Sequence, residues 1–319
     1  MNHNAEPADL LPRIAVLGAG AMGCLFGAFL AESGVRVLLV DTWREHVAML
    51  NKNGITMETP AGCRSVTDVS ATCDYAALRD ATIVFVFVKA AATEAAIRKA
   101  VSCVPCNTIF VTLQNGLGNI EALCRHLSHT RIVAGTTACG AALLGPGRVR
   151  VGGIAQTVLG TLDGGEASRA EALALLLSRA GLPARCAGNI VGSMWTKLLV
   201  NVGINAIAAL TCLPNGAIFA APEGDELAVK AVDEAVLVAK AKGIQLETDD
   251  PVGHVRAVAE ATASNTASML QDIQAARLTE IDAINGAIVR EGRALGIPVP
   301  VNETLVALVR LRQSLFESR

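Results

Sequence analysis

Residues 13–41 read RIAVLGAGAMGCLFGAFLAESGVRVLLVD, and this stretch decides the fold. A short apolar run stops at Gly18, a helix-like segment covers 22–33, and a second β-branched run closes on Asp41. The glycines follow the pattern G-x-G-x-x-G. A glycine-rich turn between a strand and a helix, with an acidic residue ending the next strand, is typical of a dinucleotide-binding βαβ unit.

Each position of the glycine motif has a physical purpose. Gly18 permits the tight turn, Gly20 lets the backbone approach a pyrophosphate, and Gly23 lets the helix pack on the strand. Ala21 and Met22 open the helix, whose unpaired N–H groups favour phosphate. The motif therefore predicts a cofactor site, and a glycine-rich turn without a cofactor is the less favoured alternative.

Asp41 carries a further inference about the cofactor. A carboxylate there can accept hydrogen bonds from both adenine-ribose hydroxyls of NAD, and it would repel the 2′-phosphate of NADP. Asp41 therefore favours NADH, although Arg44, three residues on, could soften the repulsion. The alternative is that Asp41 only caps the next helix.

The rest of the chain separates into two regions. Apolar strand-like runs at 81–88, 108–113 and 131–137 alternate with helical segments at 42–53 and 94–100, which indicates a parallel, doubly wound sheet. Residues 140–162 are glycine-rich and predict an antiparallel hairpin that extends this sheet. Beyond Gly188 we expect only helices, at 193–210, 226–242, 252–270, 279–295 and after Asn302. The sequence thus predicts an α/β fold with a flexible tail (1–12), a Rossmann dinucleotide-binding domain (13–188) and an all-helical substrate and catalytic domain (189–319).

Composition argues against several classes of partner. Charged residues are 18% of the chain and the net charge is −2, so neither a nucleic-acid surface nor a polybasic membrane surface is expected. The run at 81–88 is far shorter than the roughly 20 residues that a membrane helix needs. The first twelve residues lack the regions of a signal peptide, so we expect a cytoplasmic protein.

The nine cysteines show no disulfide framework. Cys103 and Cys106 form a CxxC pair, but no second ligand pair accompanies them as a zinc site would require. We expect reduced thiols and no bound metal.

A polar stripe crosses the apolar segment 193–210. Lys197, Asn201 and Asn205 are spaced i, i+4 and i+8, so they share one helix face. A lysine on such a helix is costly to bury without a partner. It could donate a proton to a carbonyl oxygen as hydride reaches the carbon. A solvated stripe on a surface helix is the alternative.

Further candidates precede and follow this segment in the sequence. Asn265 and Ser268 are spaced like neighbours on one helix face and could bind a carboxylate. Glu280 follows Thr279, a candidate N-cap, so a first-turn carboxylate that favours the helix dipole is its alternative role. Lys89 and Asn115 each follow a predicted strand, at the edge where open α/β sheets bind ligands. A simple Asn-Gly turn is the alternative for Asn115.

The chain resembles the ketopantoate reductase family, within the wider 6-phosphogluconate-dehydrogenase-like group. The resemblance covers about residues 13–315 and is carried by GAGAMG (18–23), FVKA (87–90), LQNGLGN (113–119), GTTACGA (135–141), WTKLLVNVGIN (195–205), NTASMLQDI (265–273) and TEIDAINGAIV (279–289).

This resemblance implies NAD(P)H-dependent reduction of 2-dehydropantoate, a small 2-keto acid, to D-pantoate on the route to coenzyme A. By motif, Lys197 is the general acid and Glu280 orients it and helps to bind substrate. The other implied roles are contact with nicotinamide and substrate for Asn115, a place near the cofactor ribose for Lys89, and substrate binding for Asn201, Asn205, Asn265 and Ser268. Helical second domains of this kind often pair, which makes a homodimer an expectation.

The chain departs from the family's pattern at three places. Many members have a basic residue after the second strand, which favours NADPH, whereas this chain has Asp41. Cys139 stands where the family often has an aromatic residue or His, and near Val151 the family often has a His. A related reductase of another 2-keto acid therefore stays an alternative. A non-catalytic dinucleotide-binding module is disfavoured because Lys197, Glu280 and Asn115 are all present.

Overall fold

A computed structural model describes residues 12–162 and 166–316 of the chain. The predicted tail 1–12 lies outside these residues except for Pro12. The described chain forms two compact units. One consists of the residues up to Gln114 and Asn119–Ile190, and the other of Asn115–Gly118 and the residues from Val191 onward. We describe each unit separately.

The first unit is built on an eight-stranded sheet with the order β12-β11-β8-β7-β6-β1-β2-β5. All neighbours in it are parallel except β11 and β8, which are antiparallel. The strands are β1 (Ile14–Leu17), β2 (Val37–Val40), β5 (Val69–Thr72), β6 (Ile83–Val86), β7 (Ile109–Thr112), β8 (Ile132–Thr137), β11 (Thr157–Thr161) and β12 (Ala184–Cys186). The doubly wound α/β expectation is confirmed.

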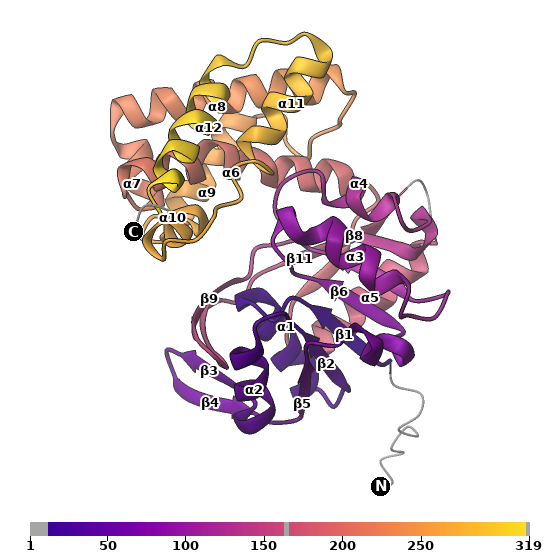
Figure 1. Ribbon diagram of the computed structural model, residues 1–319. Helices are drawn as coiled ribbons and strands as arrows, with labels where there is room; N and C mark the ends of the chain where they lie inside the picture. Colours follow the sequence, from indigo (N-terminus) through magenta and orange to yellow (C-terminus); the bar gives the residue numbers. More distant parts are fainter. Residues whose placement is uncertain (1–11, 163–165, 317–319) are drawn as a thin grey trace, which may run out of the picture. The chain divides into compact units, whose positions relative to one another are not determined.

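Helices accompany this sheet (Figure 1), and α1, α2 and α3 lie where the sequence predicts helices, at 22–33, 42–53 and 94–100. They are α1 (Ala21–Glu32), α2 (Arg44–Asn53), α3 (Thr93–Val101), α4 (Asn119–Cys124) and α5 (Ala167–Arg179), with 3₁₀ turns at η1 (Tyr75–Asp80), η2 (Ala90–Ala92) and η3 (His129–Arg131). Central strands such as β1 are fully buried, as expected for parallel strands covered on both faces.

The hairpin predicted within residues 140–162 does not extend this sheet. Strands β9 (Gly140–Gly145) and β10 (Arg148–Gly153) join β3 (Ile55–Thr59) and β4 (Gly62–Val66) in a separate four-stranded sheet with the order β4-β3-β10-β9. Helix α1 contacts strands of both sheets, and Val149 of β10 is fully buried against the same core. Of the segment 140–162 only β11 joins the main sheet, so the hairpin prediction was wrong in its placement.

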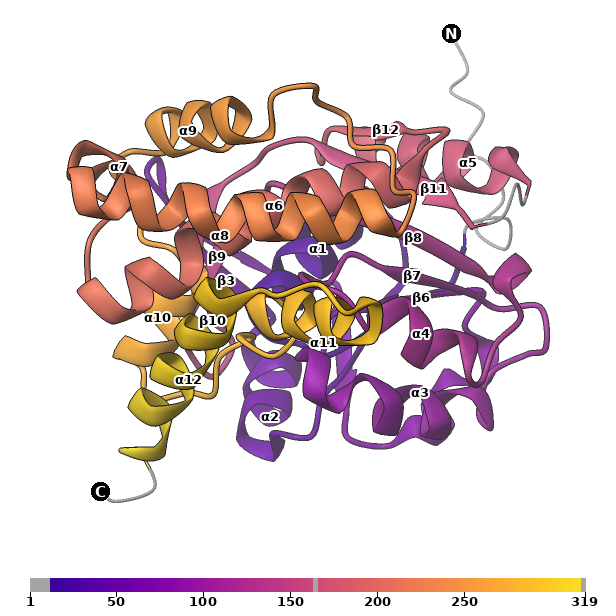
Figure 2. The ribbon, with the colours of Figure 1, turned by 90° about the horizontal axis from the view of Figure 1, so that it is seen from above.

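The second unit is helical. Its helices are α6 (Ile190–Thr211), α7 (Asn215–Ala220), α8 (Pro222–Ala241), α9 (Pro251–Ala261), α10 (Ser268–Gln274), α11 (Asn285–Leu295) and α12 (Pro300–Ser314). Helices α11 and α12 pack against each other and against α8 (Figure 2). Buried side chains of α6, such as Leu199 and Val202, contribute to the core of this unit.

Two helix predictions in this unit were wrong in their extent. The segment 252–270 is broken after Ala261, because the backbone at Ala263 and Asn265 accepts hydrogen bonds from Gly216 and Asn215. The segment 279–295 is helical only from Asn285, because the Glu280 carbonyl accepts from the N–H groups of residues 283 and 284 in a preceding turn. Thr279 is therefore not an N-cap.

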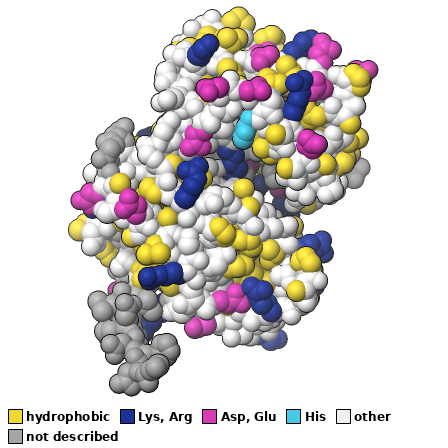
Figure 3. All heavy atoms as spheres, turned by 180° about the vertical axis from the view of Figure 1, so that it is seen from behind, with side chains coloured by type: hydrophobic (Ala, Val, Ile, Leu, Met, Phe, Trp, Pro, Cys, Tyr) yellow, Lys and Arg dark blue, Asp and Glu magenta, His cyan; other side chains and the backbone are white. Residues whose placement is uncertain are grey.

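Helix α6 is long and apolar enough to cross a membrane, by length and composition alone. Its 18-residue window has a mean hydropathy of 1.3, and 72% of that window is buried inside the protein. A core helix of a water-soluble protein meets the same criteria. Figure 3 shows basic and acidic side chains interspersed over the face that it draws.

Candidate active site

Two glycines of the motif that runs from the β1–α1 loop into α1 are required by close packing. Gly18 has φ +91°, and a Cβ added there would lie 2.7 Å from the backbone nitrogen of Val88. A Cβ on Gly23 would lie 1.9 Å from the Gly18 carbonyl oxygen. Both residues therefore allow the loop to approach β6 and the helix to approach the loop, as the sequence motif predicts.

Gly20 differs from the other two because a Cβ added there meets nothing within 4 Å. Gly20 is the N-cap of α1, which has no side-chain cap and no acidic residue in its first turn. The following residues, Ala21 and Met22, are half-buried. An uncapped helix N-terminus beside open space fits a dinucleotide pyrophosphate, since its N–H groups and the helix dipole both favour an anion.

Asp41 lies half-buried directly after β2. Its Oδ2 accepts from the Ala19 N–H at 2.7 Å, and its Oδ1 accepts from the Trp43 N–H at 2.9 Å. Trp43, not Asp41, is the N-cap of α2, so the helix-cap alternative does not apply. A carboxylate offers about four acceptor sites. Each oxygen of Asp41 therefore retains capacity for a ribose hydroxyl.

Lys89 is exposed and lies three residues after β6. In the sheet order, β1 separates β2 from β6, which makes β1 and β6 the point where the strand order reverses. Ligands of open α/β sheets bind at the carboxyl ends of the strands at such a point. Buried Gln114 supports this edge by donating to the Val88 carbonyl at 2.6 Å.

In the second unit the structure brings together Lys197, Asn115 and Glu280. The Lys197 Nζ donates to Asn115 Oδ1 at 2.9 Å, and Asn115 Nδ2 donates to Glu280 Oε2 at 3.3 Å. An ammonium group can only donate and a carboxylate can only accept. The two partners therefore determine which way the Asn115 amide points, and Asn115 links the lysine to the glutamate.

Asn115 belongs to the second unit although it follows a strand of the first. The Leu117 N–H donates to the Ala283 carbonyl at 2.8 Å. Gly116 has φ +80°, and a Cβ added there would lie 2.3 Å from the same carbonyl oxygen. Gly116 is therefore needed for this close approach, and the Asn-Gly pair is more than a generic turn.

Asn201 and Asn205 follow Lys197 along α6 at the predicted spacing. Asn205 is only 5% exposed and Asn201 is half-buried, so a fully solvated stripe is excluded. Within the described residues, neither side-chain amide makes a hydrogen bond. Neither is among the fully buried side-chain polar atoms that lack a partner, so both amides stay accessible. Both amides are therefore suited to a ligand.

The other predicted polar stripe is not a helix face. Asn265 lies between α9 and α10, and Ser268 is the first residue of α10; both are exposed. Asp272 of the same motif is buried and pairs with Arg277 at 3.2 Å. Glu280 is half-buried and lies outside α11, so the helix-dipole role proposed as its alternative does not apply.

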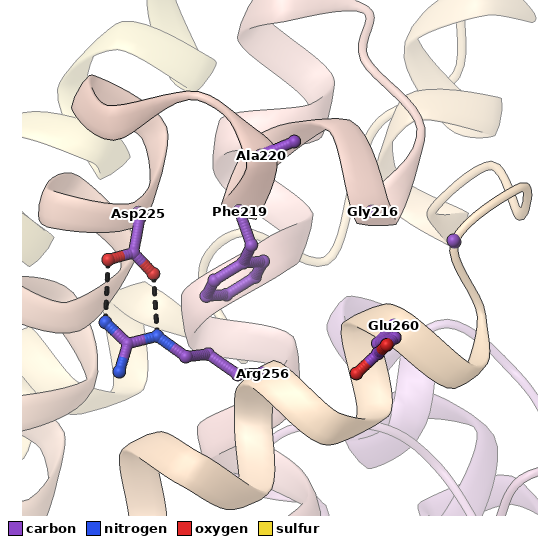
Figure 4. A pocket seen from close by; sticks show the side chains of 7 residues that line it. Gly216, Phe219, Ala220, Asp225, Arg256 and Glu260 are labelled. Carbon is purple, nitrogen blue, oxygen red and sulfur yellow. Dashed lines mark hydrogen bonds and ion pairs between the residues drawn. The ribbon is translucent and has the colours of Figure 1, made fainter.

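A cavity of about 320 Å³ in the second unit contains none of these residues (Figure 4). Helices α7, α8 and α9 form it, and its lining includes Phe219 and Glu260. Arg256 pairs there with both carboxylate oxygens of Asp225, at 2.7 and 2.6 Å. The Arg256 guanidinium, a positive charge in the lining of this cavity, is thus already neutralised by the Asp225 carboxylate.

The nine cysteines, all of them within the described residues, form no disulfide with one another; Cys103 is half-buried and Cys106 is exposed. The described residues contain no group of three or more His, Cys, Asp or Glu side chains that could hold a metal ion. Cys139 has a structural partner, since its Sγ donates to the Ala155 carbonyl at 3.1 Å. Val151 is half-buried against the core of the first unit.

One functional candidate was missed by the sequence analysis. His46 of α2 is 1% exposed and contacts the glycine-rich loop, with its Nε2 lying 2.8 Å from the Ala19 carbonyl oxygen. The sequence segment 42–53 shows only an amphipathic helix. In the sequence, the one available signal was a histidine on the apolar face of this predicted helix.

The two units thus define a class: a nicotinamide-dependent oxidoreductase with a Rossmann unit and a helical unit. Comparison with known proteins narrows this class. The family model described as ketopantoate reductase PanE/ApbA matches residues 14–164, and the model of its C-terminal part matches 189–313. The chain belongs to the ketopantoate reductase family.

Relatives match over almost the whole chain. A 2-dehydropantoate 2-reductase of Halobacterium salinarum is 37% identical over 301 residues, covering 94% of this chain and 99% of the relative. One of Archaeoglobus fulgidus is 36% identical over 302 residues, covering 93% and 97%.

Solved structures agree with this assignment. A ketopantoate reductase from Ralstonia eutropha has a TM-score of 0.87 and 33% identity, covering 96% of this chain and 99% of that one. D-mandelate dehydrogenase, in a ternary structure with NADH and anilino(oxo)acetate, has a TM-score of 0.89 and 30% identity with the same coverage. The expectations of the family, the fold and the enzyme class are confirmed.

Proposed function

We propose that this chain reduces 2-dehydropantoate to D-pantoate with a reduced nicotinamide cofactor. The observation that carries the proposal is the linked group Lys197–Asn115–Glu280, because it supplies a proton donor whose position is determined by two further side chains. The curated relatives of this family are named for that reaction.

Lys197 is the proton donor in this proposal. Its Nζ protonates the 2-keto oxygen as that oxygen gains negative charge, and a positioned acid of this kind typically contributes 10²- to 10⁴-fold in rate. Asn115 holds the ammonium group through Oδ1. Glu280 keeps the Asn115 amide in the orientation that presents this oxygen to the lysine.

The substrate's polar groups are bound by amides and a hydroxyl of the second unit. Asn201 and Asn205, on the lysine's face of α6, are suited to the keto acid's hydroxyl and carboxylate because no group in the described part of the chain bonds to their side-chain amides. Asn265 and Ser268 are assigned the same role by their match to the family motif. This set selects a small, polar 2-keto acid.

The cofactor is held by the first unit. When bound, the reduced nicotinamide supplies the hydride. Gly20 and the start of α1 receive the pyrophosphate, Lys89 lies at the strand edge on the ribose side, and Asp41 accepts from the adenine-ribose hydroxyls. Because Asp41 retains acceptor capacity and would repel a 2′-phosphate, we propose NADH as the preferred cofactor. Many members of the family favour NADPH instead.

A second candidate is the reduction of another 2-keto acid to a D-2-hydroxy acid. It is supported by the similarity to D-mandelate dehydrogenase with NADH, and by Cys139 and Val151, which lie at or near positions where the family often has an aromatic residue or His. We also expect a cytoplasmic location and self-association as a homodimer.

A substrate panel separates the two candidates. The kcat/KM is measured for 2-dehydropantoate and for 2-oxo-2-phenylacetate, the keto acid that corresponds to mandelate, each with NADH and NADPH. We expect 2-dehydropantoate to be preferred by at least about tenfold, which corresponds to 1.4 kcal/mol. A preference for the aromatic keto acid would establish the second candidate instead.

A further inference from the structure

Ala19, between the first two glycines of the motif, is held at both of its backbone polar groups. Its N–H donates to Asp41 Oδ2 at 2.7 Å. Its carbonyl oxygen lies 2.8 Å from Nε2 of His46 and also accepts from the Cys24 Sγ at 3.0 Å. Asp41, which follows β2, therefore holds the N–H of Ala19. Cys24 of α1 and His46 of α2 hold its carbonyl oxygen.

The surroundings of His46 determine its tautomer. The Gly147 N–H donates to His46 Nδ1 at 2.9 Å, so Nδ1 must carry a lone pair. The proton of the neutral ring then sits on Nε2, which donates it to Ala19. The ring is 1% exposed and stacks on Trp43 with centroids 5.2 Å apart and planes 12° apart. Both ring nitrogens thus have defined partners.

Cys24 supports the same carbonyl as a thiol. Burial, with a smaller contribution from the charge of Asp41, raises the pKa of Cys24 to about 12. The thiol therefore keeps its proton at neutral pH and remains a donor. Because a thiol is a weak donor, the imidazole N–H is the stronger of the two anchors.

Holding the Ala19 carbonyl has a direct consequence for Gly20. The peptide unit between these residues is planar and trans, so its C=O and N–H point in opposite directions. With the carbonyl directed to His46, the Gly20 N–H points away from the protein groups that hold the loop. No described group accepts from this N–H, and Gly20 borders open space. It is free to donate to an anion.

His46 also connects the loop to the second sheet. Gly147 lies in the turn between β9 and β10, and its carbonyl accepts from the Thr56 N–H of β3 at 2.8 Å. Gly147 of the β9–β10 turn thus donates to the imidazole, and the imidazole in turn donates to the Ala19 carbonyl of the glycine-rich loop. This arrangement is rigid because each hydrogen bond is buried and directional.

We propose that His46 is a positioning residue for the dinucleotide: as the Nε2–H tautomer it holds the Ala19 carbonyl and so presents the Gly20 N–H to the cofactor's pyrophosphate. The inference rests on the proposed function in one respect, namely that the glycine-rich loop binds a dinucleotide. It assigns no contact between His46 and the cofactor.

Three substitutions at one position separate the two nitrogens. His46→Gln places an amide N–H where Nε2 lies and keeps the donor to Ala19. His46→Asn places an amide oxygen near Nδ1 and keeps only the acceptor for Gly147. His46→Phe removes both and keeps a ring beside Trp43. Val47→Ala is the control, because Val47 is a buried residue of the same helix without a hydrogen bond to the loop.

The main readout is the dissociation constant of NADH and of NADPH, measured by fluorescence titration of the protein without substrate. We expect His46→Asn and His46→Phe to weaken binding of the preferred cofactor by about tenfold or more, the scale of one buried hydrogen bond. His46→Gln should stay within about threefold. The KM for the keto acid at saturating cofactor should be unchanged, and Val47→Ala should lower the Tm without weakening NADH.

Wild-type affinity in both His46→Asn and His46→Phe would overturn the proposal. So would equal weakening in His46→Gln and Val47→Ala, since the effect would then follow stability and not the Nε2 donor. A wild-type protein that binds neither cofactor would overturn the proposed function as well. An imidazole ¹H–¹⁵N spectrum of the ligand-free protein gives a second check: we expect the Nε2–H tautomer, and the Nδ1–H tautomer would contradict it.

Discussion

Lys197 is an unusual residue for its helix, since its neighbours along α6 are almost all apolar. The structure accounts for it through Asn115, whose amide oxygen accepts from the ammonium group and whose nitrogen is held by Glu280. A lysine held in this way loses less side-chain entropy when substrate arrives, because its rotamers are already restricted.

Replacement of Lys197 by Ala should lower kcat by about a hundredfold or more, the usual effect of removing a positioned acid. The dissociation constant of NADH should change little, since the residues assigned to the cofactor, other than Asn115, lie in the first unit. Steady-state kinetics and a separate cofactor titration measure these two quantities. A variant with near-normal kcat would show that another group supplies the proton.

Glu280 should act on catalysis more than on folding. Its carboxylate lies outside α11 and makes one hydrogen bond to Asn115 at 3.3 Å, so Glu280→Gln should cost about 1 kcal/mol of stability or less. The kcat should fall or the KM for the keto acid rise, because the Asn115 amide is no longer held by a charge. A large loss of Tm with normal kinetics would make Glu280 a structural residue.

At the scale of elements, the turn from β1 to α1 combines two kinds of glycine. Gly23→Ala places a Cβ against the Gly18 carbonyl and should lower the free energy of unfolding by about 1–3 kcal/mol. Gly20→Ala fills open space and should leave the Tm near that of the wild type.

The same pair should behave in the opposite way toward the cofactor. Gly20→Ala should raise the dissociation constant of NADH by at least about tenfold, since the added methyl group occupies the space for the pyrophosphate. Denaturant unfolding and cofactor titration of both variants test this contrast. Loss of stability in Gly20→Ala with unchanged affinity would place the pyrophosphate elsewhere.

The sequence predicted the elements that follow a simple period. Strands β1, β2, β6, β7 and β8 were predicted and the motif identified Gly18, Gly20 and Gly23, whereas the short edge strands β5 and β12 were not predicted. In the second sheet the β9–β10 hairpin was predicted but assigned to the wrong sheet, and β3 and β4 were not predicted. Strand β4 has the residues GCRSV and an exposed pattern, so neither apolar alternation nor a continuous apolar run marks it.

The candidate site was predictable only in part, because periodicity shows which residues share a helix face but not which distant segments pair. The spacing of Lys197, Asn201 and Asn205 on α6 follows from the helical period. Periodicity could not show that Asn115 joins Lys197 to Glu280, because this linkage depends on a backbone pairing between Leu117 and Ala283. His46 was missed since only its contacts, and no local pattern, reveal what it holds.

At the scale of the whole molecule, the chain divides its chemistry between two units. The first carries every residue assigned to the dinucleotide except Asn115, and the second carries the acid and the substrate amides. Cofactor preference is therefore expected to change independently of the keto acid, through Asp41 alone.

NADH should be preferred over NADPH by about 30- to 150-fold in kcat/KM, corresponding to an uncompensated repulsion of about 2–3 kcal/mol. Exposed Arg44 reduces this gap if it reaches the phosphate. Asp41→Asn should improve NADPH, and an amide oxygen can still accept from the Ala19 N–H. A tenfold wild-type preference for NADPH would show that Asp41 does not bind the ribose hydroxyls.

We expect this protein to reduce the 2-keto group of 2-dehydropantoate with the Lys197–Asn115–Glu280 group as its acid. The most direct measurement is the steady-state oxidation of NADH and NADPH by the wild-type protein in the presence of 2-dehydropantoate, with chiral analysis of the product. We predict saturable turnover, with kcat/KM at or above about 10⁴ M⁻¹s⁻¹ for the preferred cofactor, and D-pantoate as the product. Binding of a reduced cofactor without turnover of 2-dehydropantoate would contradict the account.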